Sequence, residues 1–243
     1  MQSSNLEIFE AISLEQMDEV SLMKRVDTKF VVNQDILPEL LASLKSNYRI
    51  LEIGGNRMMT YDSTYFDTRE NDFYLAHHNK RTSRVKVRIR NYVESNLSFL
   101  EVKLKNNKGL TVKKRIKIRQ GEKKLNSEAL SFIEQATLQK WELNPKLTNR
   151  FNRFTLASTS EKERVTFDLN LDYNGVIHNQ KLAIIELKQE RLNRNSTLFK
   201  VLKCAYIHPY SISKYCIGMA ILHPDLKQNI FKHKLLTLNK ITS

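Results

Sequence analysis

Five short stretches of the chain place a charged residue at nearly every second position. In a β-strand, residues two apart share a face, so each stretch has one apolar face and one face of Arg, Lys and carboxylate side chains. One such strand is ordinary, but five mostly cationic ones predict a sheet with a whole surface that holds anions. The stretches are Val85–Arg90, Leu100–Lys105, Val112–Arg119, Arg164–Leu169 and Ile185–Lys188.

The charged faces have two interpretations. In the first, the apolar face packs on the core and the charged face meets solvent. Against it, the charge is biased in sign and comes in rows such as Lys86, Arg88 and Arg90, and neighbouring like charges cost energy unless an anion or a carboxylate relieves them. A closed antiparallel barrel with an apolar exterior under helices and a cationic interior removes the conflict. We therefore expect an α+β fold with such a barrel.

The bulk composition points to a polyanionic partner. The 243 residues carry 40 Lys and Arg against 26 Asp and Glu, a net charge of +14, which favours nucleic acid, phosphorylated molecules, polyphosphate or an acidic membrane surface. No apolar run approaches the roughly 18–20 residues of a membrane span, and the N-terminus lacks the basic-then-apolar order of a signal peptide. These features predict a cytoplasmic protein, with Cys204 and Cys216 reduced and buried.

The expected elements come in the order strands, helices, strands, helices, which favours an antiparallel α+β fold over a βαβ repeat. No repeat or linker divides the chain, so we expect a single domain over 1–243, with flexible tails at 1–6 and about 229–243. Strands are expected at 25–33, 48–53 and 58–66, four between 84 and 119, then 164–172 and 181–188. Helices are expected at 13–23, 35–46, 127–138, 146–158, 196–206 and 213–222, with a partly ordered helix in the tail.

Seven motifs of the chain occur in an order typical of one family. Together they cover about residues 7–222 and resemble the VTC domain, the catalytic domain of polyphosphate polymerases, which belongs with the CYTH-like triphosphate tunnel metalloenzymes. The ExExK signature of the CYTH branch is absent, which favours the VTC branch. The motifs are RVDTKF (25–30), YFDT (65–68), RVKVRIRNY (84–92), FLEVKLKNNKG (99–109), ERVTFD (163–168), IIELK (184–188) and SKY (213–215).

The resemblance implies a tunnel of eight antiparallel strands that binds a triphosphate with a divalent cation, Mn²⁺ or Mg²⁺. It further implies transfer of the γ-phosphate of ATP to a growing polyphosphate chain. An inorganic triphosphatase or tripolyphosphatase of the same fold is the alternative enzyme, and a non-catalytic polyphosphate-binding module is the alternative from another class. Nucleic acid is a poor candidate because the striped strands have few aromatic side chains on which bases could stack.

Five basic residues match the tunnel residues that the resemblance makes catalytic. A planar guanidinium chelates two phosphate oxygens, so Arg suits an extended polyanion. Because no GxxxxGK[ST] loop is present, side chains must bind the triphosphate. The catalytic candidates are Lys29, Arg88, Arg90, Lys103 and Arg164.

A second set is expected to bind phosphate around them. Arg150 and Arg153 lie three apart on one face of the expected helix 146–158, and at least one of them should reach the tunnel. Ser213 and Lys214 resemble a closing phosphate clamp, with a helix cap beside a solvated lysine as the alternative. The full set is Lys86, Lys113, Arg115, Arg150, Arg153, Lys188, Ser213 and Lys214.

Two glutamates are the metal-ligand candidates. A lone Glu186 between Ile185 and Leu187 on a strand is costly unless it is paired or metal-bound, and Mg²⁺ and Mn²⁺ prefer oxygen ligands. Glu101 either binds the metal or orients Arg and Lys side chains, and Asp168 is expected to pair with Arg164. The basic tail is expected to be a solvated helix, with a separate membrane partner or the inner face of a membrane as the alternative contact.

Overall fold

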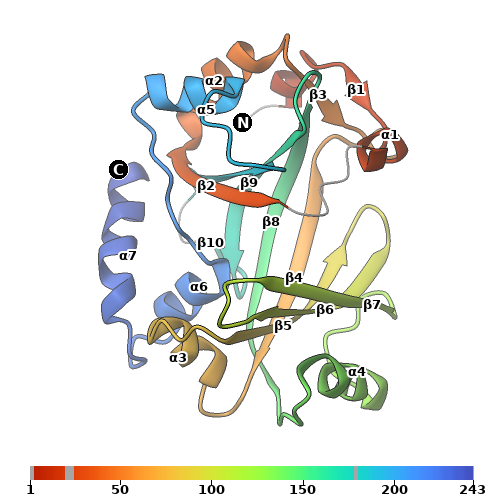
Figure 1. The fold of residues 1–243 in the computed structure, drawn as a ribbon, viewed down its shortest axis with the longest axis vertical. Helices are drawn as coiled ribbons and strands as arrows, with labels where there is room; N and C mark the ends of the chain where they lie inside the picture. The colour runs from red at the N-terminus through yellow and green to blue at the C-terminus, as the bar shows by residue number, and fades with distance from the viewer. Residues whose placement is uncertain (1–2, 20–24, 178–179, 243) are drawn as a thin grey trace.

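The computed structural model describes residues 3–19, 25–177 and 180–242 and is built around one strongly curved sheet (Figure 1). Eight strands follow one another in the order β2-β11-β9-β8-β4-β5-β6-β7, and every neighbouring pair is antiparallel. Their bounds are β2 Val26–Asn33, β4 Met59–Asp67, β5 Arg84–Tyr92, β6 Leu97–Lys105, β7 Thr111–Ile118, β8 Asn144–Ser158, β9 Glu163–Tyr173 and β11 Leu182–Gln189. Three short strands extend this sheet: β3 Tyr48–Leu51 pairs with β8, β1 Ala11–Ile12 pairs with β3, and β10 Val176–Ile177 pairs with β9.

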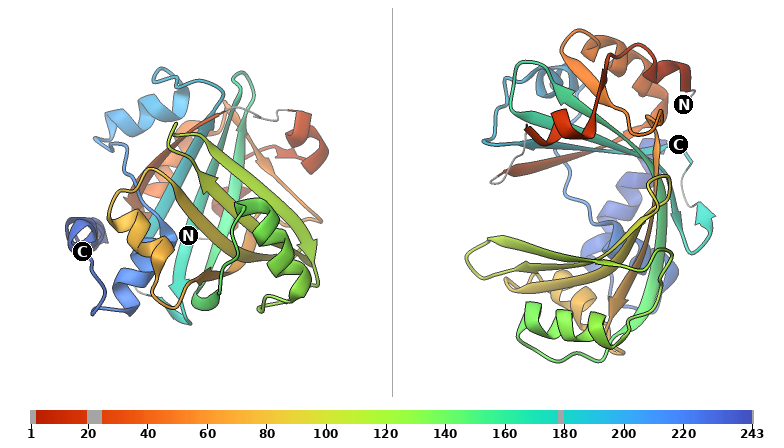
Figure 2. Two further views of the ribbon diagram at one scale, coloured as in Figure 1. Left: turned by 60° about the horizontal axis from the view of Figure 1, so that its bottom comes forward. Right: turned by 90° about the vertical axis from the view of Figure 1, so that its right-hand side faces the viewer.

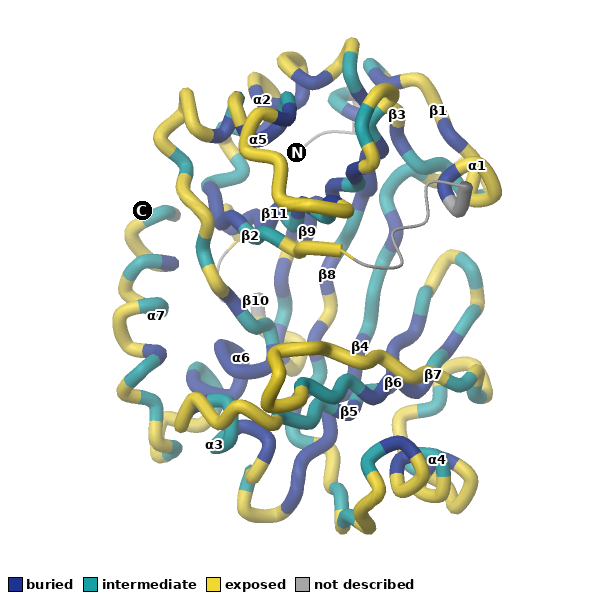
Figure 3. The backbone as a smooth tube through the Cα atoms, viewed as in Figure 1, coloured by how far each residue is buried: buried dark blue, intermediate teal, exposed yellow. Residues whose placement is uncertain are grey.

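The two halves of this sheet face each other across an inner space (Figure 2, right), which confirms the predicted eight-stranded antiparallel tunnel fold. Among the described residues, no ladder joins the edge strands β2 and β7, so the hydrogen-bonded path ends there without full closure. The edge strand β7 is exposed along most of its length, whereas β9 is mostly buried (Figure 3). Lys113, Lys114 and Lys117 on β7 are the kind of charged side chain that prevents an open edge from pairing with another chain.

The helices cover the sheet in three places. On the outer face of one half lie α2 Leu37–Leu44 and α5 Thr197–Cys204, which pack on β2, β9 and β11. On the outer face of the other half lies α4 Ser127–Thr137, packed on β5 and β6. At one end of the inner space, α3 Asp72–His78, α6 Lys214–Leu222 and α7 Asn229–Thr242 form a third core. The remaining elements are α1 Leu14–Glu19 and the 3₁₀ helices Ser3–Leu6 and Gln34–Ile36.

Several predicted elements are confirmed, and three predictions are wrong. The helices expected at 127–138, 196–206 and 213–222 correspond to α4, α5 and α6, and the basic tail forms the ordered helix α7. The helix expected at 13–23 is α1, and residues 20–24 lie outside the described residues. Residues 84–119 form three strands, not four, because only two turns interrupt them. Cys216 is buried as predicted, but Cys204 is exposed at the end of α5.

The third wrong prediction is the helix at 146–158, which is the long strand β8. Leu147 and Phe151 lie on its inner face, in the core with α6, whereas Phe154 lies on its outer face under α2 and α5. The apolar face switches along the strand, so the buried positions follow the i, i+4, i+7 spacing of a helix. The spacing of apolar residues therefore predicted a helix, although the backbone of this segment is extended.

No helix within the described ranges has both the length and the apolar character to cross a membrane.

Candidate functional site

A cavity of about 820 Å³ lies between the two halves of the sheet. Side chains from all eight main strands and from the segment before α6 line it, and Lys and Arg far outnumber Asp and Glu among them. Fourteen of the fifteen residues predicted from the sequence lie on this wall: Lys29, Lys86, Arg88, Arg90, Glu101, Lys103, Lys113, Arg115, Arg153, Arg164, Glu186, Lys188, Ser213 and Lys214. Their functional roles stay predictions.

The alternation of side chains along β5 explains this arrangement. Lys86, Arg88 and Arg90 face the cavity, whereas Val87 and Ile89 are buried on the outer face. Tyr92, which also lines the cavity, lies six residue steps beyond Lys86 on the same strand, so the wall extends about 20 Å along this strand. A single β-strand thus presents a row of cations over most of the length of the cavity.

Glu101 on β6 neutralises two cations of the wall, Arg88 and Lys113. It lies directly opposite Arg88 on β5 and Arg115 on β7 in the ladder, and its side chain is 1% exposed. Arg88 donates from Nε to Oε2 at 2.7 Å, and Lys113 pairs with Oε1. Burial alone would raise the pKa of Glu101, but Arg88, Arg90 and Lys113 outweigh it and hold that pKa below its usual range.

Asp168 on β9 has the same role in the other half of the sheet. Its side chain is 2% exposed. Arg153 on β8 lies directly opposite in the ladder and donates to Oδ1 at 2.5 Å and to Oδ2 at 2.7 Å, while Lys214 at the start of α6 pairs with Oδ2. Burial opposes ionisation, but the two cations lower the pKa of Asp168 below its ordinary value.

The expected pairing of Asp168 with Arg164 is therefore wrong. The two residues share a face of β9 but lie four positions apart, about 13 Å along a strand, whereas Arg153 faces Asp168 across the ladder. Arg164 instead donates to the backbone oxygen of Met17 on α1 at 2.5 Å.

Glu186 on β11 is the most exposed of the three carboxylates Glu101, Asp168 and Glu186. Its side chain is 17% exposed, and Lys188 pairs with Oε2 at 2.6 Å while Lys29 lies 3.5 Å from Oε1. Burial would raise the pKa of Glu186, but Lys188 and Lys29 lower it well below its usual range. Glu186 is thus ionised and, on the Oε1 side, only loosely paired.

Lys103 on β6 is a lysine of the wall whose charged form is disfavoured by its surroundings. It lies in the ladder between Lys86 and Lys113, so three lysines stand side by side across three strands. No ion pair to Lys103 occurs among the described residues. Burial, and then the charge of Arg88, lower the pKa of Lys103 to about 7.

These features, a curved antiparallel sheet with cations and ionised carboxylates on its inner face, agree with the family comparison. The model of the VTC domain family matches residues 24–223. The chain belongs to the VTC domain family. No curated protein matches it.

Solved structures show the same fold. A candidate adenylate cyclase from Bacillus halodurans is 16% identical, with a TM-score of 0.55 over 78% of this chain and 94% of that one. A candidate adenylyl cyclase from Hippeastrum, described as having a dominant triphosphatase activity, is 13% identical, with a TM-score of 0.52 over 82% and 96%. At these identities the likeness shows the triphosphate tunnel fold alone.

The donor set of this VTC domain accommodates a divalent cation at one carboxylate. Among the described residues, no three His, Cys, Asp or Glu side chains group together as metal ligands. Both oxygens of Glu101 and of Asp168 are taken by close ion pairs, whereas Glu186 is open to the cavity. Mg²⁺ commonly uses one or two protein carboxylates and completes its shell with phosphate oxygens and water. The residues present fit such an ion at Glu186.

One predicted site residue of the VTC domain lies elsewhere. Arg150 is exposed and is not among the residues that line the cavity. Arg150 and Arg153 are three positions apart, which on a helix would share a face but on β8 places them on opposite faces. Arg153 therefore reaches the cavity and Arg150 does not.

Sequence reasoning missed the aromatic part of the wall. The guanidinium of Arg153 lies 4.9 Å from the ring centre of Tyr61, that of Arg90 lies 5.3 Å from the same ring, and that of Arg115 lies 4.8 Å from Phe99. Cation–π contacts of this kind hold a guanidinium in place without neutralising it. The alternation of Met59, Tyr61 and Tyr65 on β4 was a signal that could have identified these rings.

Proposed function

We propose that the chain is a polyphosphate polymerase that transfers the γ-phosphate of ATP to a growing polyphosphate chain with the help of a divalent cation. Membership of the VTC domain family and the triphosphate tunnel fold support an enzyme acting on nucleoside triphosphates or polyphosphate. The γ-phosphate could be transferred to another phosphate or to water, and the chemistry of the cavity wall decides between these two acceptors.

The observation that carries this proposal is the state of the buried carboxylates. Glu101, Asp168 and Glu186 all lie in ion pairs that keep their pKa values low, so each is a weak base. Attack by water calls for a group that accepts its proton, whereas an ionised terminal phosphate is a nucleophile without one. The wall therefore suits a phosphate acceptor better than water.

In this mechanism the basic side chains position the chain of phosphates. Phosphoryl transfer depends mainly on alignment and on stabilising negative charge. Arg88 and Arg153 are each held by a buried carboxylate, so their remaining N–H groups point in fixed directions when substrate binds. Lys103 has no ion-pair partner within the described ranges and is positioned to take up the charge of the transferring phosphoryl group. A divalent cation held by Glu186 would neutralise part of the triphosphate charge.

A triphosphatase is the second candidate because of Lys103. With its pKa lowered to about 7, part of the population is neutral at neutral pH and is able to accept a proton from attacking water. The Lys103→Arg variant separates the two activities, because arginine keeps the charge but cannot act as a base. Hydrolysis would be lost in this variant, while transfer to polyphosphate would continue.

The test is to incubate the purified protein with ATP and Mn²⁺ and, separately, with tripolyphosphate and Mn²⁺. We expect a long-chain product from ATP that an exopolyphosphatase digests, and slow release of phosphate from tripolyphosphate. Release of free phosphate in both reactions, without polymer, would show the triphosphatase. Binding of polyphosphate without any turnover would show a binding module.

A further inference from the structure

Three lysines from three separate elements converge on the segment 211–213, which crosses one end of the cavity just before α6. Lys29 on β2 donates to the backbone oxygen of Ile212 at 3.2 Å, and Lys86 on β5 donates to Ser213 Oγ at 3.0 Å. Lys234 on α7 donates to the backbone oxygen of Ser211. All three side chains line the cavity.

The three ammonium groups are close to one another and poorly neutralised. Burial is the main cause of the lowered pKa values of Lys86 and Lys234, and the positive charge of Lys29 lowers both pKa values further. Within the described ranges, Lys86 and Lys234 have no carboxylate within ion-pair distance, and the single one near Lys29 is Glu186 at 3.5 Å. Their other partners are a hydroxyl and backbone oxygens, which orient cations but do not cancel their charge.

His77 at the end of α3 adds a second observation at the same place. Its ring lines the cavity beside Phe231 of α7, with 6.0 Å between the ring centres. Its Nδ1 is buried and has no hydrogen-bond partner. Burial, Lys86, Arg84 and Lys234 lower the pKa of His77 to about 3, so the ring is neutral and its buried Nδ1 has no partner in a strongly cationic surrounding.

The opposite end of the cavity has a different character. Beyond Arg90 along β5, Tyr92 lines the cavity together with Leu51, Met59 and Leu97 from neighbouring elements, and the charged residues there are Glu94 and Arg57. Because Arg57 is paired with Glu52, this more apolar part of the wall suits an uncharged group such as a nucleoside. A nucleoside triphosphate would therefore place its nucleoside in this part of the cavity and direct its phosphates toward the 211–213 segment.

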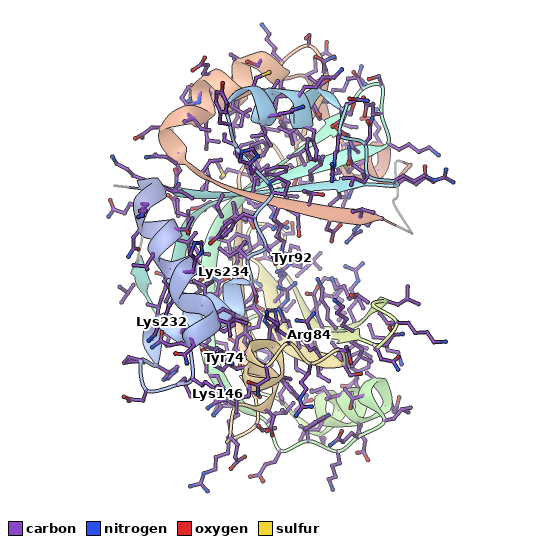
Figure 4. The ribbon with its side chains drawn as sticks, turned by 60° about the vertical axis from the view of Figure 1, so that its left-hand side comes forward. Tyr74, Arg84, Tyr92, Lys146, Lys232 and Lys234 are labelled. Carbon is purple, nitrogen blue, oxygen red and sulfur yellow. The ribbon has the colours of Figure 1, made fainter. Side chains whose placement is uncertain are left out.

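We propose that α7 completes an anion-binding site at the 211–213 end of the cavity, in which Lys29, Lys86 and Lys234 hold the phosphates of a chain longer than a triphosphate. That the anion is polyphosphate rests on the proposed function. α7 spans Asn229–Thr242 and so lies outside residues 24–223, which the family model matches. Lys234 is therefore a binding residue outside the part of the chain that the family model covers. Figure 4 shows Lys234 on the side of α7 toward the sheet and Lys232 on its outer side.

The test measures the dissociation constants of tripolyphosphate and of long-chain polyphosphate by titration calorimetry at one salt concentration. Lys234→Gln removes the charge and keeps an N–H donor on a side chain that is one bond shorter. Lys232→Gln on the exposed side of the same helix is the matched control. Thermal melting of both variants checks that α7 remains folded.

We expect Lys234→Gln to raise the dissociation constant of the long chain by about fivefold, the loss of one charged contact at a partly exposed site. Tripolyphosphate binding should change little, and Lys232→Gln should resemble the unaltered protein for both ligands. The site would be overturned if Lys234→Gln and Lys232→Gln raised the dissociation constant of the long chain equally. It would also be overturned if Lys234→Gln weakened the binding of tripolyphosphate and of the long chain equally. If the unaltered protein makes polymer but Lys234→Gln binds long chains normally, the site alone is refuted. If the unaltered protein binds no polyphosphate at all, the site and the proposed function fail together.

Discussion

Asp168 pairs with two cations of the cavity, so Asp168→Asn should lower the stability of the folded protein by leaving both cations unpaired. The side chains of Asp168, Arg153 and Lys214 are 2%, 14% and 15% exposed, and little solvent is available to screen the two positive charges. Removing one partner of a buried charge pair costs about 3–5 kcal/mol. In a domain of this size each kcal/mol lowers the melting temperature by about 2–4 °C, so we expect a drop of about 10 °C.

An added anion should reverse much of this loss, because it takes the place of the missing carboxylate. A ligand at a hundred times its dissociation constant stabilises a protein by about 2.7 kcal/mol, and the extra positive charge in Asp168→Asn should make tripolyphosphate bind more tightly. The assay is thermal melting with and without tripolyphosphate. The control is Glu190→Gln, which alters an exposed ion pair with Lys162 at 4.0 Å and should change the melting temperature by little.

Equal melting temperatures for Asp168→Asn and Glu190→Gln would show that Asp168 does not hold the two cations. A smaller rise on adding tripolyphosphate to Asp168→Asn than to the unaltered protein would show the same. The sign of the pH dependence gives a further check. Because the folded-state pKa of Asp168 is lowered, its contribution to stability is present above the unfolded value of about 4 and disappears as the pH falls. In Asp168→Asn, the free energy of unfolding should therefore fall less steeply as the pH is lowered.

Three further changes test separate parts of the account. Glu186→Gln should reduce Mn²⁺-dependent polymer synthesis by about 100-fold or more while metal-free tripolyphosphate binding is kept; calorimetry showing undiminished Mn²⁺ binding would contradict this role. Lys103 has a pKa of about 7, so tripolyphosphate affinity should fall between about pH 6 and pH 8 as its charge is lost, and Lys103→Arg, which stays charged, should lack that part of the pH dependence. Gly218→Ala should lower the free energy of unfolding in urea by about 1–3 kcal/mol, since its Cβ would lie 2.6 Å from the ring of Tyr173 on β9; an unchanged midpoint would show that α6 adjusts freely.

Alternating charge predicted the inner wall of the cavity well because it has a simple geometric cause. Residues two apart on a strand share a face, so Lys86, Arg88 and Arg90 had to lie together once the segment was recognised as a strand. The partner strand then fixed Glu101 beside Arg88. For these residues, the local pattern contains nearly all the information needed.

The same reasoning failed where the fold changes which face is buried. On β8 the apolar side chains Leu147 and Phe154 lie on opposite faces, because α6 covers one and α2 and α5 cover the other. Nothing local in the sequence states which helices return to which face. For the same reason the pairing of Asp168 with Arg153, and the approach of Lys234 from α7, could not be predicted without the register of distant segments.

The fate of the γ-phosphate of ATP decides whether the chain is a polyphosphate polymerase. Purified protein with Mn²⁺ and ATP labelled at the γ-phosphate should transfer the label into a polymer that an exopolyphosphatase digests, with one ADP released for each phosphate incorporated. Arg88→Ala, which removes a cation from the centre of the cavity, should abolish the incorporation. Label recovered only as free phosphate would contradict the account.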